Sequence, residues 1–206
     1  MTSRVLPLSA EELLEAIAAE IMFCPRCRLS ETRKKAVPGE GSAQSRIMLV
    51  GEGPGRNEDV EGRPFVGQAG KFLDALLTEA GLVRKEVFIC NVVRCRPPEN
   101  WEPLPDEIEA CTPYLNRQIA LIKPKMIVPL GKHSTAYMFS KAKLLFDNIT
   151  KARGKFFKTK LWGMQITIFP TFHPAAALYN GEYKSQLVED FRLLGKELVR
   201  IGFTKQ

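Results

Sequence analysis

The stretch Ile47-Met48-Leu49-Val50, followed at once by Gly51-Glu52-Gly53-Pro54-Gly55, decides the fold class of this chain. Four consecutive apolar residues stopped by a glycine are typical of a strand that is buried on both faces of a sheet. The glycines that follow predict a tight loop, because glycine adopts backbone angles that other residues resist. N–H groups exposed in such a loop could hold an anion, although an ordinary turn fits the spacing equally well.

Further apolar runs predict three more strands, at residues 87–93, 126–130 and 165–169. Helical spacing of apolar residues, with capping signals, predicts helices at 9–21, 72–81, 105–122 and 187–198. This alternation predicts an α/β fold of three layers, with a central four-stranded parallel sheet flanked by helices. Ligands of such sheets bind beyond the carboxyl ends of the strands. The loops that follow Val50, Asn91 and Phe169 are therefore expected to form the site.

Composition limits the class of protein. Apolar residues make up 45% of the 206 residues, which is enough for one domain spanning residues 1–206. The net charge of +7 favours an anionic partner, although many basic enzymes bind no nucleic acid. Neither a secretory signal nor an apolar run of about 20 residues is present, so we expect a soluble cytoplasmic protein that is not bound to membranes. Cytosolic thiols rarely pair, so its cysteines should be reduced or metal-bound.

Four of the five cysteines are candidates for a metal site. Cys24 and Cys27 form a C-x-x-C pair, and Cys95 and Cys111 lie far along the chain. Cys90 lies among apolar residues of the second predicted strand, which indicates a core position. Four thiolates suit either zinc or an iron–sulfur cluster, and the residue types alone do not choose between them. The alternative is that the cysteines are scattered small hydrophobic residues.

Several polar or aromatic residues stand in the predicted loops or interrupt apolar runs. Asn91 breaks an apolar strand, so its amide either bonds to backbone or reads a ligand. Phe65 lies in a loop, where it is either a stacking platform for a base or a small core residue. His173 directly follows the fourth strand, at a position where residues face a ligand, although a lone histidine is more often structural. His133 is interpreted as structural.

Two charged stretches have both a functional and an ordinary interpretation. Glu58, Asp59 and Glu61 form an acidic stretch that would usually be a solvated loop. Residues 151–160 carry five basic residues with Phe156 and Phe157 between them. This pattern suits a phosphate backbone, and a solvated hairpin explains it equally well.

Taken together and in this order, the motifs resemble those of the family-four uracil-DNA glycosylases, the iron–sulfur branch of their superfamily. The stretches that carry the resemblance are Cys24-Pro25-Arg26-Cys27, Gly51 to Gly55 with Glu58-Asp59, Gly62-Arg63-Pro64-Phe65-Val66-Gly67, Asn91-Val92-Val93-Arg94-Cys95-Arg96-Pro97-Pro98, Cys111 and His173-Pro174. They span nearly the whole chain and are highly specific as a set. The family usually has alanine where Gly53 stands, a small change that should keep the loop open.

The resemblance implies a fold, an activity and a cofactor. The fold would be a four-stranded parallel sheet between helices. The enzyme would flip uracil out of single- or double-stranded DNA and hydrolyse its N-glycosidic bond, as a monomer acting in base excision repair. Cys24, Cys27, Cys95 and Cys111 would hold a structural 4Fe-4S cluster, and Cys90 would not.

The resemblance also implies roles for individual residues. The uracil would be bound by Gly51, Glu52, Gly53, Phe65, Asn91 and His173, with Phe65 stacking on the base and Asn91 reading its edge. His173 would donate to uracil O2, and Glu52 is the first choice to position the attacking water. Glu58 is the second choice for that catalytic role, or it crowds the C5 position and excludes thymine. The residues expected to contact DNA are Leu178 or Tyr179 as the inserting wedge, with Lys151, Arg153 and Lys155.

Three other functions compete with a glycosylase. A covalent trap for uracil-DNA would need an inserted basic loop with a histidine, and the chain has no such insert after Asn91. A binding module without catalysis would leave Glu52, Phe65, Asn91 and His173 with no shared purpose. An electron-transfer protein would not bind uracil-DNA tightly.

Overall fold

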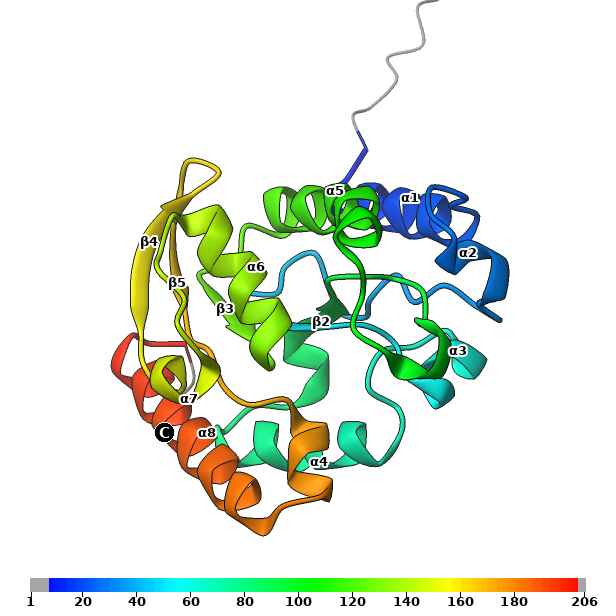
Figure 1. The fold of residues 1–206 in the computed structure, drawn as a ribbon. Helices are drawn as coiled ribbons and strands as arrows, with labels where there is room; N and C mark the ends of the chain where they lie inside the picture. Colours follow the sequence, from blue (N-terminus) through cyan, green and yellow to red (C-terminus); the bar gives the residue numbers. More distant parts are fainter. Residues whose placement is uncertain (1–7, 204–206) are drawn as a thin grey trace, which may run out of the picture.

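The structure is a computed structural model that describes residues 8–203. Its centre is a five-stranded sheet in the order β2-β1-β3-β5-β4 (Figure 1). The strands are β1 (Ile47–Gly51), β2 (Val87–Asn91), β3 (Met126–Pro129), β4 (Phe157–Leu161) and β5 (Met164–Ile168). The predicted strands β1, β2, β3 and β5 are parallel, as expected.

The additional strand corrects the expected number of four. β4 pairs antiparallel with β5 and forms the outer edge of the sheet. It overlaps the end of the basic stretch 151–160, and its charged residues there alternate with half-buried ones. Charged side chains are common on edge strands, because they discourage pairing with another chain. A strand of this composition has no continuous apolar run, so the sequence pattern does not reveal it.

Helices cover both faces of the sheet, so the three-layer prediction is confirmed. One face carries α1 (Ala10–Met22), α5 (Pro105–Ile122) and α6 (Lys132–Ala142), and the other carries α4 (Gln68–Glu79) and α8 (Gly181–Arg200). Alternate residues of β1 serve the two layers: Met48 and Val50 belong to the first core, and Ile47 and Leu49 belong to the second.

Short helices connect these layers. They are α2 (Leu29–Thr32), α3 (Arg56–Glu61), α7 (Ile149–Ala152) and the 3-10 turns η1 (Arg84–Glu86), η2 (Pro98–Asn100) and η3 (Pro174–Leu178). No helix within residues 8–203 is long and apolar enough to cross a membrane.

Helix α1 begins at the predicted capping box. The Ser9 hydroxyl accepts from the Glu12 N–H at 3.2 Å, and the Ser9 N–H donates to the Glu12 carboxylate at 2.7 Å. The helix buries Leu14, Ile17 and Ile21 and packs against α5. This contact brings the chain that follows α1, with Cys24 and Cys27, towards Cys111 on α5.

Strand register assembles the predicted site at one edge of the sheet. Gly51 pairs with Asn91 at the ends of β1 and β2. Beyond β3 and β5, Leu130 pairs with Thr171, two residues before His173. The loops that follow these strands therefore meet, as the parallel arrangement predicts.

Candidate active site

A cavity of about 350 Å³ opens at this edge of the sheet. Its walls include Glu52, Glu58, Phe65, Asn91, Trp101 and His173. Glu52 and His173, which are 121 positions apart in the sequence, therefore line the same cavity. Gly53 and Tyr179 also line the cavity, so all but Gly51 of the residues predicted to contact uracil do so.

Gly51 lies beneath the cavity, where no larger residue fits. A Cβ atom at Gly51 would lie 2.3 Å from Asn91 Oδ1 and 2.8 Å from the Phe65 ring. Both distances are far shorter than a van der Waals contact. The absence of a side chain at Gly51 thus allows the Asn91 amide and the Phe65 ring to face one small space.

The Asn91 amide oxygen lacks a partner. Asn91 is 1% exposed, and its Oδ1 accepts no hydrogen bond within residues 8–203. A buried acceptor without a donor costs about 1–3 kcal/mol. Such an atom in a native protein calls for an explanation, and a role in binding or catalysis is one of those that fit an atom beside a cavity. This favours the base-reading interpretation of Asn91 over a structural one.

Phe65 is held in an unusual backbone conformation. Its φ of 51° lies in the left-handed region, which bulky residues rarely adopt. The Arg84 guanidinium donates to the carbonyl oxygens of Pro64 and Phe65 and so supports this turn. The ring stacks against the His173 ring with a centroid distance of 5.5 Å. Phe65 therefore forms a rigid aromatic wall rather than a mobile loop side chain.

The structure assigns a tautomer to His173. Its Nδ1 accepts from the Ala175 N–H at 3.2 Å, so the proton of the neutral ring resides on Nε2. Burial lowers the pKa of His173 to about 4, and the charge of Glu58 opposes this shift only in part. The ring is thus neutral at pH 7 and still has one N–H to donate.

The two candidate carboxylates lie in different surroundings. One Glu58 oxygen accepts from the Val66 and Gly67 N–H groups at 2.9 and 3.1 Å, and the other accepts from the Gly55 N–H at 3.1 Å. Glu58 therefore joins the glycine loop to the loop that carries Phe65. This engagement occupies both of its oxygens and leaves it poorly suited to orient a water molecule.

Glu52 makes a looser contact and keeps its carboxylate towards the cavity. Its side chain is 31% exposed and lies 3.9 Å from Nε2 of His133. Burial raises the pKa of Glu52, the charge of His133 lowers it, and the charge of Glu102 raises it. Of the two carboxylates, Glu52 is the one available to a water molecule in the cavity.

The sequence indicates a structural role for His133, and the structure places its ring near the Glu52 carboxylate. Its Nε2 lies 3.0 Å from a Glu102 oxygen as well as near Glu52. The signal that could have located it is its position just after β3, at the same sheet edge as the other loops. No motif indicates the role of Arg84, because its support of the Phe65 turn depends on contacts between distant segments.

The four predicted cysteines lie close to one another. Burial raises the pKa of Cys27 and Cys95, and raises that of Cys111 to about 12, with further upward contributions from neighbouring thiols. Among these neighbours is Cys24, which acts on both Cys27 and Cys95. Cys90 is fully buried in the core, as predicted.

Two N–H groups already point at these sulfur atoms. The Arg33 guanidinium donates to Cys95 Sγ at 3.1 Å, and the Arg94 N–H donates to Cys111 Sγ at 3.2 Å. Such donors stabilise thiolates rather than thiols. Within residues 8–203, however, no three cysteine, histidine or acidic side chains converge tightly enough to share one metal ion.

The predicted DNA-contacting residues occupy two separate places. Leu178 and Tyr179 are 44% and 90% exposed at the end of η3, beside the cavity. Lys151 is exposed on α7 and pairs with Asp147. Neither pairing nor exposure tests a contact with DNA, so these assignments stay predictions.

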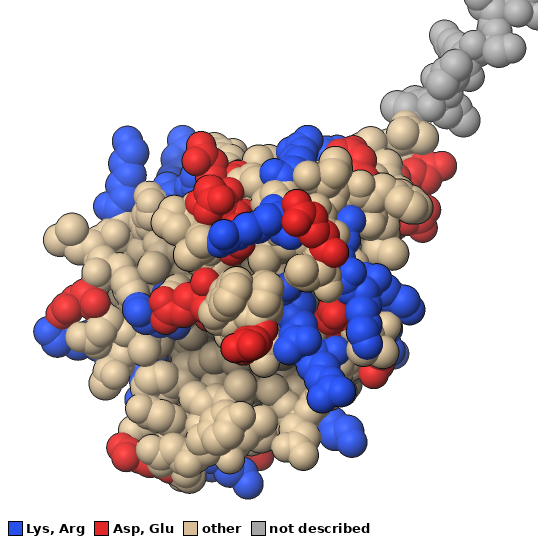
Figure 2. Space-filling view, turned by 45° about the vertical axis from the view of Figure 1, so that its right-hand side comes forward, with Lys and Arg blue, Asp and Glu red and all other residues tan. Residues whose placement is uncertain are grey.

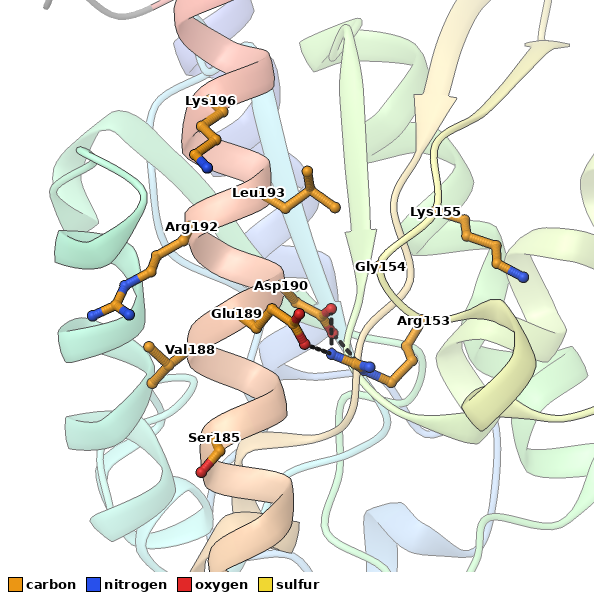
Figure 3. A pocket seen from close by; sticks show the side chains of 10 residues that line it. All are labelled: Arg153, Gly154, Lys155, Ser185, Val188, Glu189, Asp190, Arg192, Leu193 and Lys196. Atoms are coloured by element: carbon orange, nitrogen blue, oxygen red, sulfur yellow. Dashed lines mark hydrogen bonds and ion pairs between the residues drawn. The ribbon is translucent and has the colours of Figure 1, made fainter.

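Arg153 has a firm partner inside the protein. Figure 3 shows its guanidinium turned towards Asp190 on α8, whereas Lys155 points away. The Arg153–Asp190 distances are 2.6 and 3.0 Å, and Asp190 also accepts from the Thr171 hydroxyl at 2.6 Å. Because Thr171 lies two residues before His173, this ion pair supports the loop that carries the histidine.

Basic and acidic side chains are interspersed over the face shown in Figure 2, with several Lys and Arg residues along its right-hand side. The net charge of +7 is therefore spread out rather than concentrated in one patch on this face.

Comparisons with known proteins agree with this geometry. A family model described as the uracil DNA glycosylase superfamily matches residues 38–192. A type-4 uracil-DNA glycosylase of Saccharolobus solfataricus is 52% identical over 90% of this chain and 86% of its own. Those of Sulfurisphaera tokodaii and Archaeoglobus fulgidus are 56% identical over 87% of the chain (82% of theirs) and 42% identical over 90% (93% of theirs). The chain therefore belongs to the uracil-DNA glycosylase superfamily and, within it, to the type-4 family.

Removing the buried partner of Arg153 should destabilise the protein. The Asp190→Ala variant leaves a guanidinium that is only 17% exposed without its carboxylate, so the free energy of unfolding should fall by about 3 kcal/mol. Glu189→Ala is the matched control, because Glu189 is 76% exposed and 3.5 Å from Arg153. Urea denaturation should show a loss of about 0.5 kcal/mol or less for that control. Equal losses in the two variants would contradict the supporting role of Asp190.

Proposed function

We propose that this protein is a uracil-DNA glycosylase that flips uracil out of DNA and hydrolyses its N-glycosidic bond. The products are free uracil and an abasic site, the first step of base excision repair. The observation that carries this proposal is the unpaired, buried Oδ1 of Asn91 beside the Phe65 ring. Family membership supports the same conclusion.

Asn91 provides the selectivity for uracil. Its amide oxygen accepts from uracil N3–H and its amide nitrogen donates to O4, while Phe65 stacks on the ring. Cytosine has an acceptor at N3 and a donor at C4, so both amide contacts would fail. A buried polar site strongly rejects a ligand that leaves its groups unpaired. Gly51 supports this pocket by leaving room for both side chains.

His173 and Glu52 act on the two sides of the bond that breaks. As the bond to the sugar breaks, negative charge builds on uracil and positive charge builds on the deoxyribose. The Nε2–H of neutral His173, with backbone N–H groups near Glu52 and Gly53, donates to uracil O2 and stabilises that negative charge. Glu52 orients the attacking water and offsets the positive charge of the sugar.

Glu58 has a supporting role in this mechanism. Its three backbone contacts fix the glycine loop relative to Phe65, and this sets the width of the uracil pocket. A narrow pocket beside C5 would also exclude the methyl group of thymine. The proposal thus gives the catalytic carboxylate role to Glu52 and the positioning role to Glu58.

Cys24, Cys27, Cys95 and Cys111 would hold a 4Fe-4S cluster. The four neighbouring thiols and the N–H groups that point at two of them support this assignment. The cluster would supply a covalent link between the end of α1, the loop after β2 and α5, with no part in bond cleavage. Its removal should therefore loosen the segment between Cys95 and Cys111.

The remaining assignments concern DNA and the assembly. Leu178 or Tyr179 would fill the space that the flipped base leaves, and Lys151 and Lys155 would contact phosphates. Arg153 could reach a phosphate only by leaving Asp190. We propose a single-domain monomeric enzyme that acts on DNA inside the cell.

The activity can be measured directly as base release. An oligonucleotide with one labelled uracil should lose that base over multiple turnovers, while matched thymine and cytosine oligonucleotides stay intact. Asn91→Ala should lower the rate about a hundredfold or more, because a truncated side chain makes neither edge contact. Binding of the oligonucleotide without any release of uracil would overturn the proposed function, and unchanged turnover in the variant would overturn the role of Asn91.

Substitution of Glu52 should mainly affect the rate of uracil release, and substitution of Glu58 should mainly affect stability. Glu52→Gln should reduce the single-turnover rate of uracil release about a hundredfold with little effect on stability, because it removes a charge and a base from the cavity. Glu58→Gln should lower the free energy of unfolding by about 1–3 kcal/mol, because an amide accepts hydrogen bonds through only one of its two atoms. The opposite pattern in rate and denaturation measurements would exchange the two roles.

The cluster can be tested without an activity assay. Cys95→Ala should lose the brown colour, the broad visible absorbance and the bound iron and sulfide of the purified protein. Cys90→Ala is the control and should keep all of them, because that fully buried side chain is not among the four proposed ligands. An intact cluster in Cys95→Ala would remove this residue from the ligand set.

A further inference from the structure

The loop between Cys95 and Cys111 has a strained backbone next to the cavity. Glu99 and Asn100 are consecutive residues with φ values of 51° and 59°, both in the left-handed region. Non-glycine residues seldom adopt this conformation, and two in succession are held only where surrounding contacts impose them. Trp101 follows directly, so the double turn determines where its indole lies.

Contacts on both sides hold this loop in place. The Arg96 guanidinium donates to the Asn100 side-chain oxygen at 2.8 Å, which closes the turn. One residue beyond Trp101, Glu102 lies 3.0 Å from Nε2 of His133 on α6. The loop is therefore tied both to itself and to the helix that follows β3.

Trp101 is a large apolar side chain that is only half covered by the protein. It is 48% exposed, and it lines the same cavity as Phe65 and Asn91. Tyr179, which is 90% exposed, lines this cavity too. An indole that served the core would be covered, whereas this one has much of its surface open to solvent beside the opening.

We propose that Trp101 is a stacking platform for a nucleobase adjacent to the flipped uracil in the DNA strand. The inference rests on the proposed function and extends it, because Phe65 and Asn91 account only for the uracil itself. The flat indole offers a π-face to any base, so this contact adds affinity without adding sequence preference. Tyr179 lines the same cavity, so a second aromatic side chain is available to the strand.

A base is the occupant that the surroundings favour. A strand whose uracil enters the cavity must bring its neighbouring nucleotides to the rim, within reach of the residues that line it. Unstacking next to a flipped nucleotide exposes the faces of its neighbours, and an aromatic side chain restores part of the lost stacking. The strained turn presents the indole before DNA arrives, which reduces the ordering cost of binding.

Intrinsic fluorescence can test this contact, because the chain has only two tryptophans. The other, Trp162, lies in the turn between β4 and β5, so Trp162→Phe leaves Trp101 as the sole indole. The probe is a single-stranded oligonucleotide with one 2′-fluoro-2′-deoxyuridine, whose electron-withdrawing fluorine slows cleavage of the glycosidic bond. Trp101 emission should be quenched in step with binding measured by the anisotropy of a labelled strand. The Trp101→Phe variant, in which only Trp162 emits, should show no quenching.

Affinity provides the second measurement. Trp101→Ala should weaken binding of the oligonucleotide about tenfold, and Trp101→Phe should weaken it less, because a phenyl ring still stacks. Binding of free uracil should weaken much less than binding of the oligonucleotide in both variants, since the base itself contacts Phe65 and Asn91. A general loss of structure would weaken the binding of both ligands together. A larger loss of affinity for the oligonucleotide than for free uracil therefore identifies a contact with the neighbouring base.

The outcomes separate this inference from the proposed function. Saturating binding without quenching of Trp101, or unchanged affinity in Trp101→Ala, overturns the stacking role while uracil release by the wild-type chain stands. Equal weakening of free uracil and the oligonucleotide also overturns it. A wild-type chain that neither binds the oligonucleotide nor releases uracil overturns both proposals.

Discussion

The close approach of β1 and β2 at their carboxyl ends is the constraint on which the site depends. Gly51 and Asn91 pair in register there, and no Cβ atom fits between the Asn91 amide and the Phe65 ring. The pairing is fixed by apolar residues of both strands, which alternate between two separate cores. Hydrophobic burial thus places a polar amide where none of residues 8–203 offers its oxygen a donor.

The polar side chains around the cavity are of two kinds: some bond to other parts of the protein, and others have a donor or acceptor that is not used in this way. Glu58, Arg84 and the Arg153–Asp190 pair use their charges to hold the loops before and after the cavity. In the proposed mechanism, Asn91 Oδ1 and His173 Nε2–H make their hydrogen bonds with the ligand. A site that is preorganised in this way costs little rearrangement when charge develops on uracil.

The sequence predicted the architecture and residues that line one cavity, because both predictions follow from short-range patterns. Apolar runs and helical spacing located four of the five strands and the principal helices, and family motifs selected Phe65, Asn91 and His173. The edge strand β4 escaped because its half-buried alternation resembled a solvated basic segment. The roles of Arg84, His133 and Asp190 could not be predicted, since each depends on partners that only folding brings near.

The central claim is that Asn91 accepts a hydrogen bond from uracil N3–H, and binding of free bases tests it most directly. Uracil and 3-methyluracil differ at that one atom, and isothermal titration calorimetry can compare their affinities for the intact protein. The account predicts measurable binding of uracil and a loss of about tenfold or more for 3-methyluracil, because the methyl group removes the donor and meets the buried amide. Equal affinity for the two bases would contradict it.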